Sequence, residues 1–228
     1  MNKKYRHEVK YIVPETELCM IKNQIRYICQ LDKHVKENGM YHISSLYFDD
    51  YKNTAFYANQ EGINPRKKYR IRIYDNNMDN AYLERKEKQG DMIHKDSCKC
   101  SKGKIQEILM QELEMWDINE DLKKDFWLEW NNNILRPKII ISYDRVPYVY
   151  PVGNVRITFD MNISASADLL NFGSDKLHVR PLMPYGKQLI EVKWDEMLPD
   201  VIYNIVSQQR MHRIAFSKYF LGRSLMAI

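Results

Sequence analysis

The sequence predicts an α+β fold, in which an antiparallel eight-stranded closed β-barrel carries peripheral helices. Several short runs alternate charged and apolar residues with the period of two that is typical of strands. Tight turns join most of these runs, and helical patterns separate groups of them. Antiparallel sheets of about eight strands commonly close into barrels that hold side chains or one ligand. Because no stretch has the composition of a linker, we expect residues 1–228 to form a single domain.

The first 60 residues predict two strands and two helical segments. Residues 5–13 alternate as a strand does. Pro14 and the acidic residues after it then open a helix that runs to about residue 31, with apolar residues at helical spacing. Residues 41–49 form the next predicted strand, and residues 50–60 predict a short helix or turn.

The middle of the chain predicts a meander of three strands. These are residues 67–75, 81–88 and 92–97, joined by a hairpin loop at 76–80 and a tight turn at 89–91. The pattern then becomes helical from Lys104 to about Asn133.

The last third predicts more strands, followed by helices. The strands are residues 138–145, 155–163, 177–180 and 189–194, with Pro181 limiting the third of them. Residues 199–209 and 215–221 are expected to be helical, and Gly222 is expected to cap the second of these helices.

Composition narrows the class of protein. A net charge of +5 over 228 residues is too small for a basic nucleic-acid-binding arm, so we expect no nucleic acid partner. The N-terminus has no signal-peptide pattern, and no apolar run is long enough to predict a transmembrane segment. The four cysteines are expected to be reduced thiols, which predicts a cytoplasmic protein.

The charged faces of the predicted strands indicate the chemistry. If they share one interior, that interior is strongly positive, and cations gathered away from water need an anion. A condensed phosphate fits, and carboxylates among the cations could hold Mg²⁺ or Mn²⁺. The alternative is that these charges are solvent faces with cross-strand ion pairs. The cations are Lys10, Arg70, Arg72, Lys86, Arg145, Arg156 and Lys193, and the carboxylates are Glu8, Glu84, Asp160 and Glu191.

An ordered set of motifs supports the first interpretation. It comprises Arg6–Tyr11, Ser45–Asp49, Lys68–Tyr74, Leu83–Lys86, Tyr143–Arg145, Val155–Asp160, Ile190–Lys193 and Phe216–Tyr219. In this order the motifs resemble the VTC domain, the polyphosphate polymerase module of the vacuolar transporter chaperone complex. That domain belongs to the triphosphate tunnel metalloenzymes. The resemblance extends from about residue 4 to residue 223.

The resemblance implies a tunnel in which the γ-phosphate of ATP is transferred to a growing inorganic polyphosphate chain. It implies Mn²⁺ or Mg²⁺ as cofactor, with Glu191 as the metal ligand. The basic residues that it places in the tunnel as catalytic are Arg70, Arg72, Lys86, Arg145 and Arg156. Those it implies as substrate-binding or orienting are Lys10, Lys95, Lys193, Lys218, Glu8 and Glu84.

The chain departs from related families in ways that bear on activity. The sister CYTH triphosphatases begin with Glu-x-Glu-x-Lys, but Arg6 stands at the first position here, which argues against a simple triphosphatase or an adenylate cyclase. The SPX domain and transmembrane segments of the eukaryotic complex are not expected. Two alternatives stay open: a metal-dependent hydrolase of tripolyphosphate or nucleoside triphosphates, and a non-catalytic polyphosphate-binding module with a membrane-protein partner. The sequence leaves the oligomeric state open.

Overall fold

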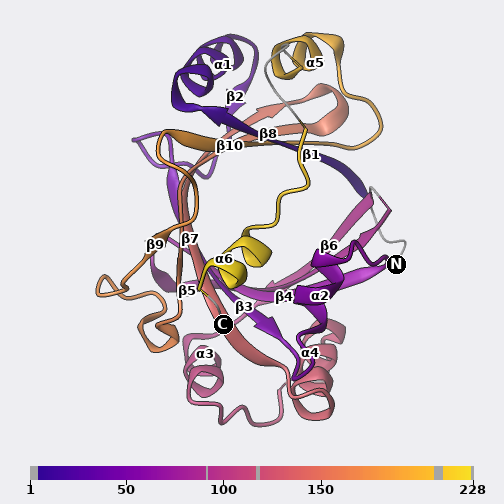
Figure 1. The fold of residues 1–228 in the computed structure, drawn as a ribbon, viewed down its shortest axis with the longest axis vertical. Helices are drawn as coiled ribbons and strands as arrows, with labels where there is room; N and C mark the ends of the chain where they lie inside the picture. Colours follow the sequence, from indigo (N-terminus) through magenta and orange to yellow (C-terminus); the bar gives the residue numbers. More distant parts are fainter. Residues whose placement is uncertain (1–4, 91, 117–118, 208–212, 227–228) are drawn as a thin grey trace.

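The computed structural model describes residues 5–90, 92–116, 119–207 and 213–226. Its centre is a closed antiparallel barrel of eight strands, which confirms the predicted fold class (Figure 1). Two further two-residue strands, β2 (Gln30–Leu31) and β9 (Arg180–Pro181), pair at its margins. In order around the barrel the strands are β7 (Arg136–Tyr150), β3 (Tyr41–Asp49), β4 (Arg66–Tyr74), β5 (Asn77–Gln89), β6 (Met92–Lys99), β1 (Arg6–Pro14), β10 (Lys187–Trp194) and β8 (Val155–Ser166), with β8 returning to β7.

Helices pack outside the barrel wall at the two ends of the molecule's long axis, and one helix lies over a barrel opening (Figure 1). At one end α1 (Glu15–Ile28) packs beside α5 (Asp200–Val206), and at the other lie α3 (Lys102–Leu109) and α4 (Asp121–Asn132). The C-terminal helix α6 (Lys218–Met226) lies in front of the barrel, against α2 (Thr54–Gln60) and strands β7 and β8. Two short 3₁₀ turns occupy Val152–Asn154 and Leu169–Asn171.

The buried apolar side chains form three clusters. Outside the barrel, α4 and the segment before it bury Trp116, Phe126 and Trp130 against outward residues of β4 and β5. A second cluster joins α1 and α5 to the outer faces of β1, β8 and β10. The third cluster includes Ile139, Ile141 and Tyr219 and lies within the barrel, against α6. Apolar side chains therefore fill one part of the barrel interior, and the charged side chains lie in the remaining part.

Several predicted boundaries are wrong, each for a local reason. The loop expected at 76–80 shrinks to Asp75 and Asn76, whose positive φ angles of 52° and 55° suit a two-residue hairpin turn, so β5 begins at Asn77. The helical pattern from Lys104 to Asn133 divides into α3 and α4. Gln111, with φ of 61°, has left the helical conformation between them.

Gly222 is not a cap but lies in the middle of α6. A Cβ atom there would lie 2.6 Å from Ile141 Cδ1 and 3.0 Å from Ile139 Cδ1, so glycine is needed for the helix to approach β7. Of the predicted helix 199–209, the structure places α5 at Asp200–Val206, and residues 208–209 lie outside the described residues. The strand expected at 177–180 is limited to Arg180–Pro181.

The barrel closes unevenly. The β3–β7 ladder pairs nine residues of β3, whereas among the described residues β1 and β6 pair through Arg6 with Ile93 and through His7 with Met92. Further along β1, the C-terminal segment takes the place of β6: the Ile214 amide donates to the Lys10 carbonyl at 3.0 Å. We call this β1–β6 junction the seam.

Candidate functional site

The barrel interior contains a basic cavity of about 1120 Å³. Its lining, among the described residues, has fourteen lysines and arginines but only three glutamates, so its charge is strongly positive. Strand alternation produces this lining, because Arg66, Lys68, Arg70 and Arg72 of β4 face inward while the residues between them face the outer helices. The other cations in the lining are Arg6, Lys10, Lys86, Lys88, Lys95, Arg145, Arg156, Lys193, Arg213 and Lys218.

A first group of charges surrounds Glu84 of β5. Its carboxylate accepts from Arg70 Nε at 2.7 Å and from Lys95 Nζ at 2.8 Å, and Arg72 Nη1 lies 3.8 Å away. Burial would raise the pKa of Glu84, but Arg70, Arg72 and Lys95 hold it well below its usual value. Arg72 is itself buried, and its Nε has no hydrogen-bond partner among the described residues. One carboxylate therefore faces three cations.

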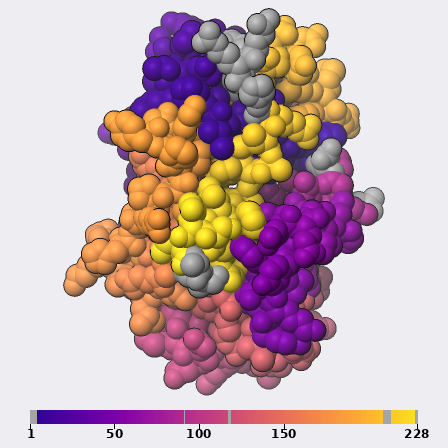
Figure 2. All heavy atoms as spheres, in the orientation of Figure 1, coloured from indigo at the N-terminus to yellow at the C-terminus, as the bar shows by residue number. Residues whose placement is uncertain are grey.

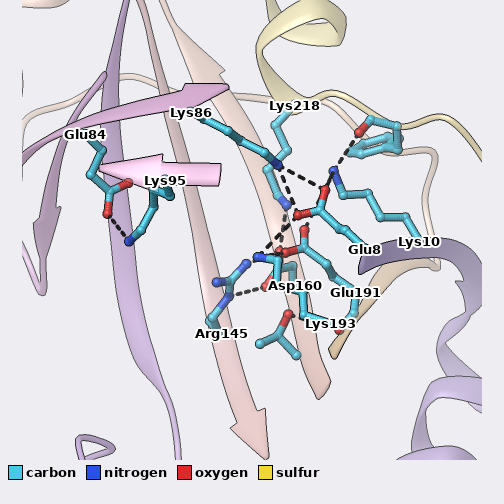
Figure 3. Close-up of polar contacts among 12 residues, drawn as sticks. Glu8, Lys10, Glu84, Lys86, Lys95, Arg145, Asp160, Glu191, Lys193 and Lys218 are labelled. Carbon is cyan, nitrogen blue, oxygen red and sulfur yellow. Dashed lines mark hydrogen bonds and ion pairs between the residues drawn. The ribbon is translucent and has the colours of Figure 1, made fainter. Parts of the chain in front are cut away.

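A second group joins Glu8 and Glu191, which lie on neighbouring strands β1 and β10 (Figure 3). Lys10 Nζ lies 2.9 Å from Glu8 and 3.8 Å from Glu191, while Lys86 Nζ donates to both Glu8 oxygens at 3.0 Å. Lys193 contacts both glutamates. Burial and Glu191 would raise the pKa of Glu8, but the lysines outweigh them and hold it well below its usual value. Both glutamates are therefore ionised.

The lysines of this second group respond differently to burial. Burial lowers the pKa of Lys86 to about 7, although Glu8 opposes the shift. Lys10 is also desolvated, yet Glu8 and Glu191 raise its pKa above the usual value. Lys86 is therefore the lysine of this group whose charge changes near neutral pH.

A third group forms around the fully buried Asp160 of β8 (Figure 3). Arg145 donates to both of its oxygens, at 2.6 and 2.7 Å, and Lys218 Nζ donates at 2.6 Å. The ring of Tyr143 lies close to both cations, with its centroid 5.1 Å from the Arg145 guanidinium carbon and 4.6 Å from Lys218 Nζ. Lys218 is the first residue of α6, so this ion pair ties the C-terminal helix to the cavity.

Arg156 is the outlying member of the predicted set. It lines the cavity, but its side chain is 45% exposed and its Nη2 donates to Asp32 at 2.9 Å. It therefore lies at the rim, whereas Arg70, Arg72 and Arg145 lie inside. Eleven of the twelve residues predicted for the site belong to this charged interior, with Glu84 placed behind the lining through Arg70 and Lys95, and Arg156 lies at its rim.

Sequence reasoning left out residues that the structure places among these charges. Lys68 points inward, whereas its sequence context indicated a solvated face as readily as an anion guide at the tunnel mouth. Continuing the alternation of Arg70 and Arg72 by one step towards the N-terminus would have found it. Tyr47, whose hydroxyl accepts from Arg70 Nη1 at 2.8 Å, and Tyr143 gave no such signal, because tyrosines are frequent throughout the sequence.

The glutamate pair is the part of the site that fits a divalent metal. Mg²⁺ and Mn²⁺ are typically held by one or two carboxylates together with phosphate oxygens and water. Glu8 and Glu191 share Lys10 and Lys193 as partners, so their carboxylates are close together. No group of three or more histidine, cysteine, aspartate or glutamate side chains suited to a metal occurs in the described part of the chain. A metal here would therefore need ligands from the substrate.

The closed antiparallel barrel encloses a cationic cavity, which is the arrangement of a tunnel-fold protein. The family model of the VTC domain matches residues 5–227, so the chain belongs to the VTC domain family. A search of curated proteins finds no match.

Solved structures share the fold at low sequence identity. A Hippeastrum protein described as an adenylyl cyclase candidate with dominant triphosphatase activity aligns with a TM-score of 0.58 at 14% identity, over 96% of this chain and 95% of its own. A Bacillus halodurans adenylate cyclase candidate aligns at 0.54 and 13% identity, over 95% and 96% of the two chains. A protein from Pyrococcus horikoshii aligns at 0.51 and 13%, over 98% and 100%. At sequence identities this low, the similarity to these structures shows a shared fold alone.

The helices of the described residues include none that is both long and apolar enough to cross a membrane.

Proposed function

We propose that this protein is a metal-dependent polyphosphate polymerase, which transfers the γ-phosphate of ATP to a growing inorganic polyphosphate chain within the basic cavity. The observation that carries the proposal is the excess of cations in the described cavity lining, which has fourteen lysines and arginines against three glutamates, with Glu84 and Asp160 directly behind it. Like charges gathered out of water repel one another unless an anion lies among them. A condensed phosphate supplies an anionic group at every repeat, which matches a cavity lined by cations on several strands.

The residues divide into four proposed roles. Arg70, Arg72, Arg145 and Arg156 bind phosphoryl oxygens, since guanidinium groups bind them in pairs. Lys10, Lys86, Lys95, Lys193 and Lys218 add point charges. Glu84 and Asp160 orient the arginines and lysines that they contact. Glu191, with Glu8 beside it, would hold Mn²⁺ or Mg²⁺ together with phosphate oxygens, and the metal would supply charge neutralisation.

The transfer itself needs positioning more than covalent help. An oxygen of the terminal phosphate of the chain attacks the γ-phosphorus of ATP. The bond from that phosphorus to the bridging oxygen breaks, and ADP leaves with the electron pair. The attacking oxygen is already anionic, so no general base is required. The cavity cations would neutralise the charge that three neighbouring phosphates bring together.

A hydrolase of tripolyphosphate or nucleoside triphosphates is the second candidate. The Hippeastrum protein, described as having dominant triphosphatase activity, favours it, because that protein has the same fold. In that case the cavity would direct water rather than a phosphate chain at the terminal phosphate. Arg6, in place of the first glutamate of the triphosphatase motif, favours the polymerase. The third candidate function is a module that binds polyphosphate without catalytic turnover.

Product analysis separates these functions. The protein is incubated with radiolabelled ATP and Mn²⁺ or Mg²⁺. Acid-insoluble labelled chains are expected from a polymerase, only free phosphate from a hydrolase, and neither from a binding module. The polymerase proposal fails if free phosphate is the sole product with both metals.

Replacing Arg72 should abolish chain synthesis in that assay. Arg72 is buried and lines the cavity, so Arg72→Ala removes one of the cations proposed to bind phosphate and also relieves repulsion with Arg70. The fold should survive, as judged by circular dichroism. Arg26→Ala removes the same charge from the exposed surface of α1 and should leave synthesis unchanged. Synthesis at the wild-type rate by Arg72→Ala would refute the assignment.

We also propose that residues 1–228 form one VTC-like domain, with ATP and polyphosphate as its ligands. The cytoplasmic location stays a prediction. All four cysteines are free thiols in the structure.

A further inference from the structure

Lys68 is an inward cation of β4 whose side-chain hydrogen bonds, among the described residues, go to neutral groups. Its Nζ donates to Asn59 Oδ1 at 2.8 Å and to Ser217 Oγ at 3.1 Å. It also lies 5.2 Å from the ring centroid of Tyr219. An ammonium group has three donors, so these two bonds leave one donor for another acceptor.

The charges around Lys68 make its position unfavourable without an anion. Arg66 lies two residues before it on the same face of β4, and Lys86 is its partner in the β4–β5 register. Lys10 faces it from β1. Burial, followed by these three cations, lowers the pKa of Lys68 well below its usual value.

The carboxylate whose negative charge acts on Lys68 is that of Asp49, and it already accepts hydrogen bonds from other groups. Asp49 accepts from the amides of Ala55 and Phe56, at 2.9 and 3.0 Å, and from the Tyr219 hydroxyl. It therefore holds the start of α2 and part of α6. Three elements, β4, α2 and the segment before α6, thus place Lys68 among cations and neutral groups.

We infer that Lys68 is a further phosphate-binding residue of the cavity, which extends the cationic row of Arg70 and Arg72 along β4 towards α2 and the C-terminal segment. The inference rests on the proposed function, because it takes the ligand of Lys68 to be a condensed phosphate. The free donor of Lys68 binds a phosphoryl oxygen, and the charge of the phosphate offsets Arg66, Lys86 and Lys10. Because residues two apart on a strand are separated by about 7 Å, the row from Arg66 to Arg72 spans about 20 Å. A row of that length suits a chain of phosphates.

Phosphate binding at Lys68 should also change the protonation of its amine. An anion favours the charged form of a neighbouring amine, so binding should draw a proton onto Lys68 from the solvent. A lysine that only ties α2 to the C-terminal segment would not cause this uptake. Proton uptake therefore separates a binding role from a structural one.

The test measures binding of linear polyphosphate, without ATP, by isothermal titration calorimetry at neutral pH. Titrations in two buffers with different ionisation enthalpies give the number of protons taken up. Lys68→Met should weaken binding about tenfold, the loss typical of one charged hydrogen bond. Lys68→Arg should keep most of the affinity but take up fewer protons than the wild type, because arginine stays charged.

Lys67→Met is the matched control. Lys67 is the neighbour of Lys68 in β4, but it points outward, is 51% exposed and contacts Glu129 of α4. This variant should bind polyphosphate as the wild type does, with the same proton uptake. A loss as large as that of Lys68→Met would overturn the inference, since net charge alone would then explain both.

Other outcomes are equally decisive. Wild-type affinity in Lys68→Met, or unchanged proton uptake in Lys68→Arg, overturns the role of Lys68 and leaves the proposed polymerase standing. If the wild type does not bind polyphosphate at all, both proposals fail together. Thermal unfolding checks the fold of each variant, and if Lys68→Met does not fold, the proton count of Lys68→Arg decides.

Discussion

At the scale of single residues, a small number of buried carboxylates offset the charge of many buried cations in the cavity. Glu84 is one such carboxylate: it accepts from Arg70 and Lys95, and Arg72 lies 3.8 Å away. The sequence predicted Glu84 as a site residue through the charged face of its strand. It did not predict these three partners, since they come from β4 and β6, on either side of β5.

Replacing Glu84 should therefore destabilise the protein. Glu84→Gln leaves three cations without their shared carboxylate, and breaking a buried ion pair from one side typically costs about 3–5 kcal/mol. We expect a lower free energy of unfolding in urea for this variant. Polyphosphate should restore part of the loss by replacing the missing negative charge. Glu129→Gln, which removes a carboxylate that contacts Lys67 on the outer surface, should have a much smaller effect. Equal losses in the two variants would contradict this account of the cavity.

Lys86 should make anion binding depend on pH. Burial lowers its pKa to about 7, so the lysine is charged below that pH and becomes neutral above it. Because a neutral amine does not attract phosphate, affinity for polyphosphate should fall as pH rises through about 7. Lys86→Arg keeps the charge and should reduce this dependence, although Lys68 can still contribute. Calorimetric titrations at pH values on either side of 7 measure it. An affinity that rises with pH would contradict the assignment.

At the scale of elements, α6 brings a terminal part of the sequence to the cavity. Lys218 at its first position contacts Asp160, and Gly222 one turn later lets the helix lie against Ile139 and Ile141. The sequence predicted a helix here but read Gly222 as its end. Glycine after an apolar run usually marks a helix terminus, and the close approach to β7 that reverses this interpretation is visible only in the folded chain.

A larger side chain at position 222 should displace α6. In Gly222→Leu, the new Cβ would lie 2.6 Å from Ile141 Cδ1 before the rest of the side chain is added. We expect a lower melting temperature and weaker polyphosphate binding, because Lys218 moves with the helix. Gly103→Ala is the control, since nothing lies within 4 Å of a Cβ at that helical position. This control should be neutral or stabilising by up to about 1 kcal/mol. Wild-type stability in Gly222→Leu would show that the contact with β7 is not restrictive.

At the scale of the whole molecule, the barrel is held most weakly at the seam. In the described ranges two residue pairs join β1 to β6, and the segment that contains Ile214 continues the contact along β1. Cavity cations lie on both sides, with Lys86 and Lys95 on β5 and β6, and Lys10 and Lys193 on β1 and β10. Figure 2 shows the C-terminal residues, in yellow, running over this face of the molecule between the indigo N-terminal part and the purple segment that includes α2.

Hydrogen exchange should reveal this uneven closure. Amides at the seam, in residues 6–7 and 92–93, should exchange faster than those of the β3–β7 ladder, because few hydrogen bonds must open there. Polyphosphate should slow the exchange at the seam, since an anion bound by cations from both sides holds them together. The ladder serves as the internal control and should change little. Seam amides that are as protected as the ladder without ligand would contradict this prediction.

The sequence by itself determined the strands, their two faces and the charged residues that share a face. A period of two separates the side chains of a strand regardless of its surroundings. The same pattern does not say which face lies inside, because a charged face suits water as well as a ligand cavity. Here the resemblance of the ordered motifs to a known family indicated the inward direction, whereas barrel closure was already predicted from the number of antiparallel strands.

Only the tertiary structure decided which charges meet. Lys68 acquires neutral partners from α2 and the C-terminal segment, Arg156 is drawn to the rim by Asp32, and Asp160 receives Lys218 from 58 residues away. These contacts join segments that are distant in the sequence, so no local pattern encodes them. Coulomb interactions depend on distance and burial, and both are fixed only when the barrel has closed.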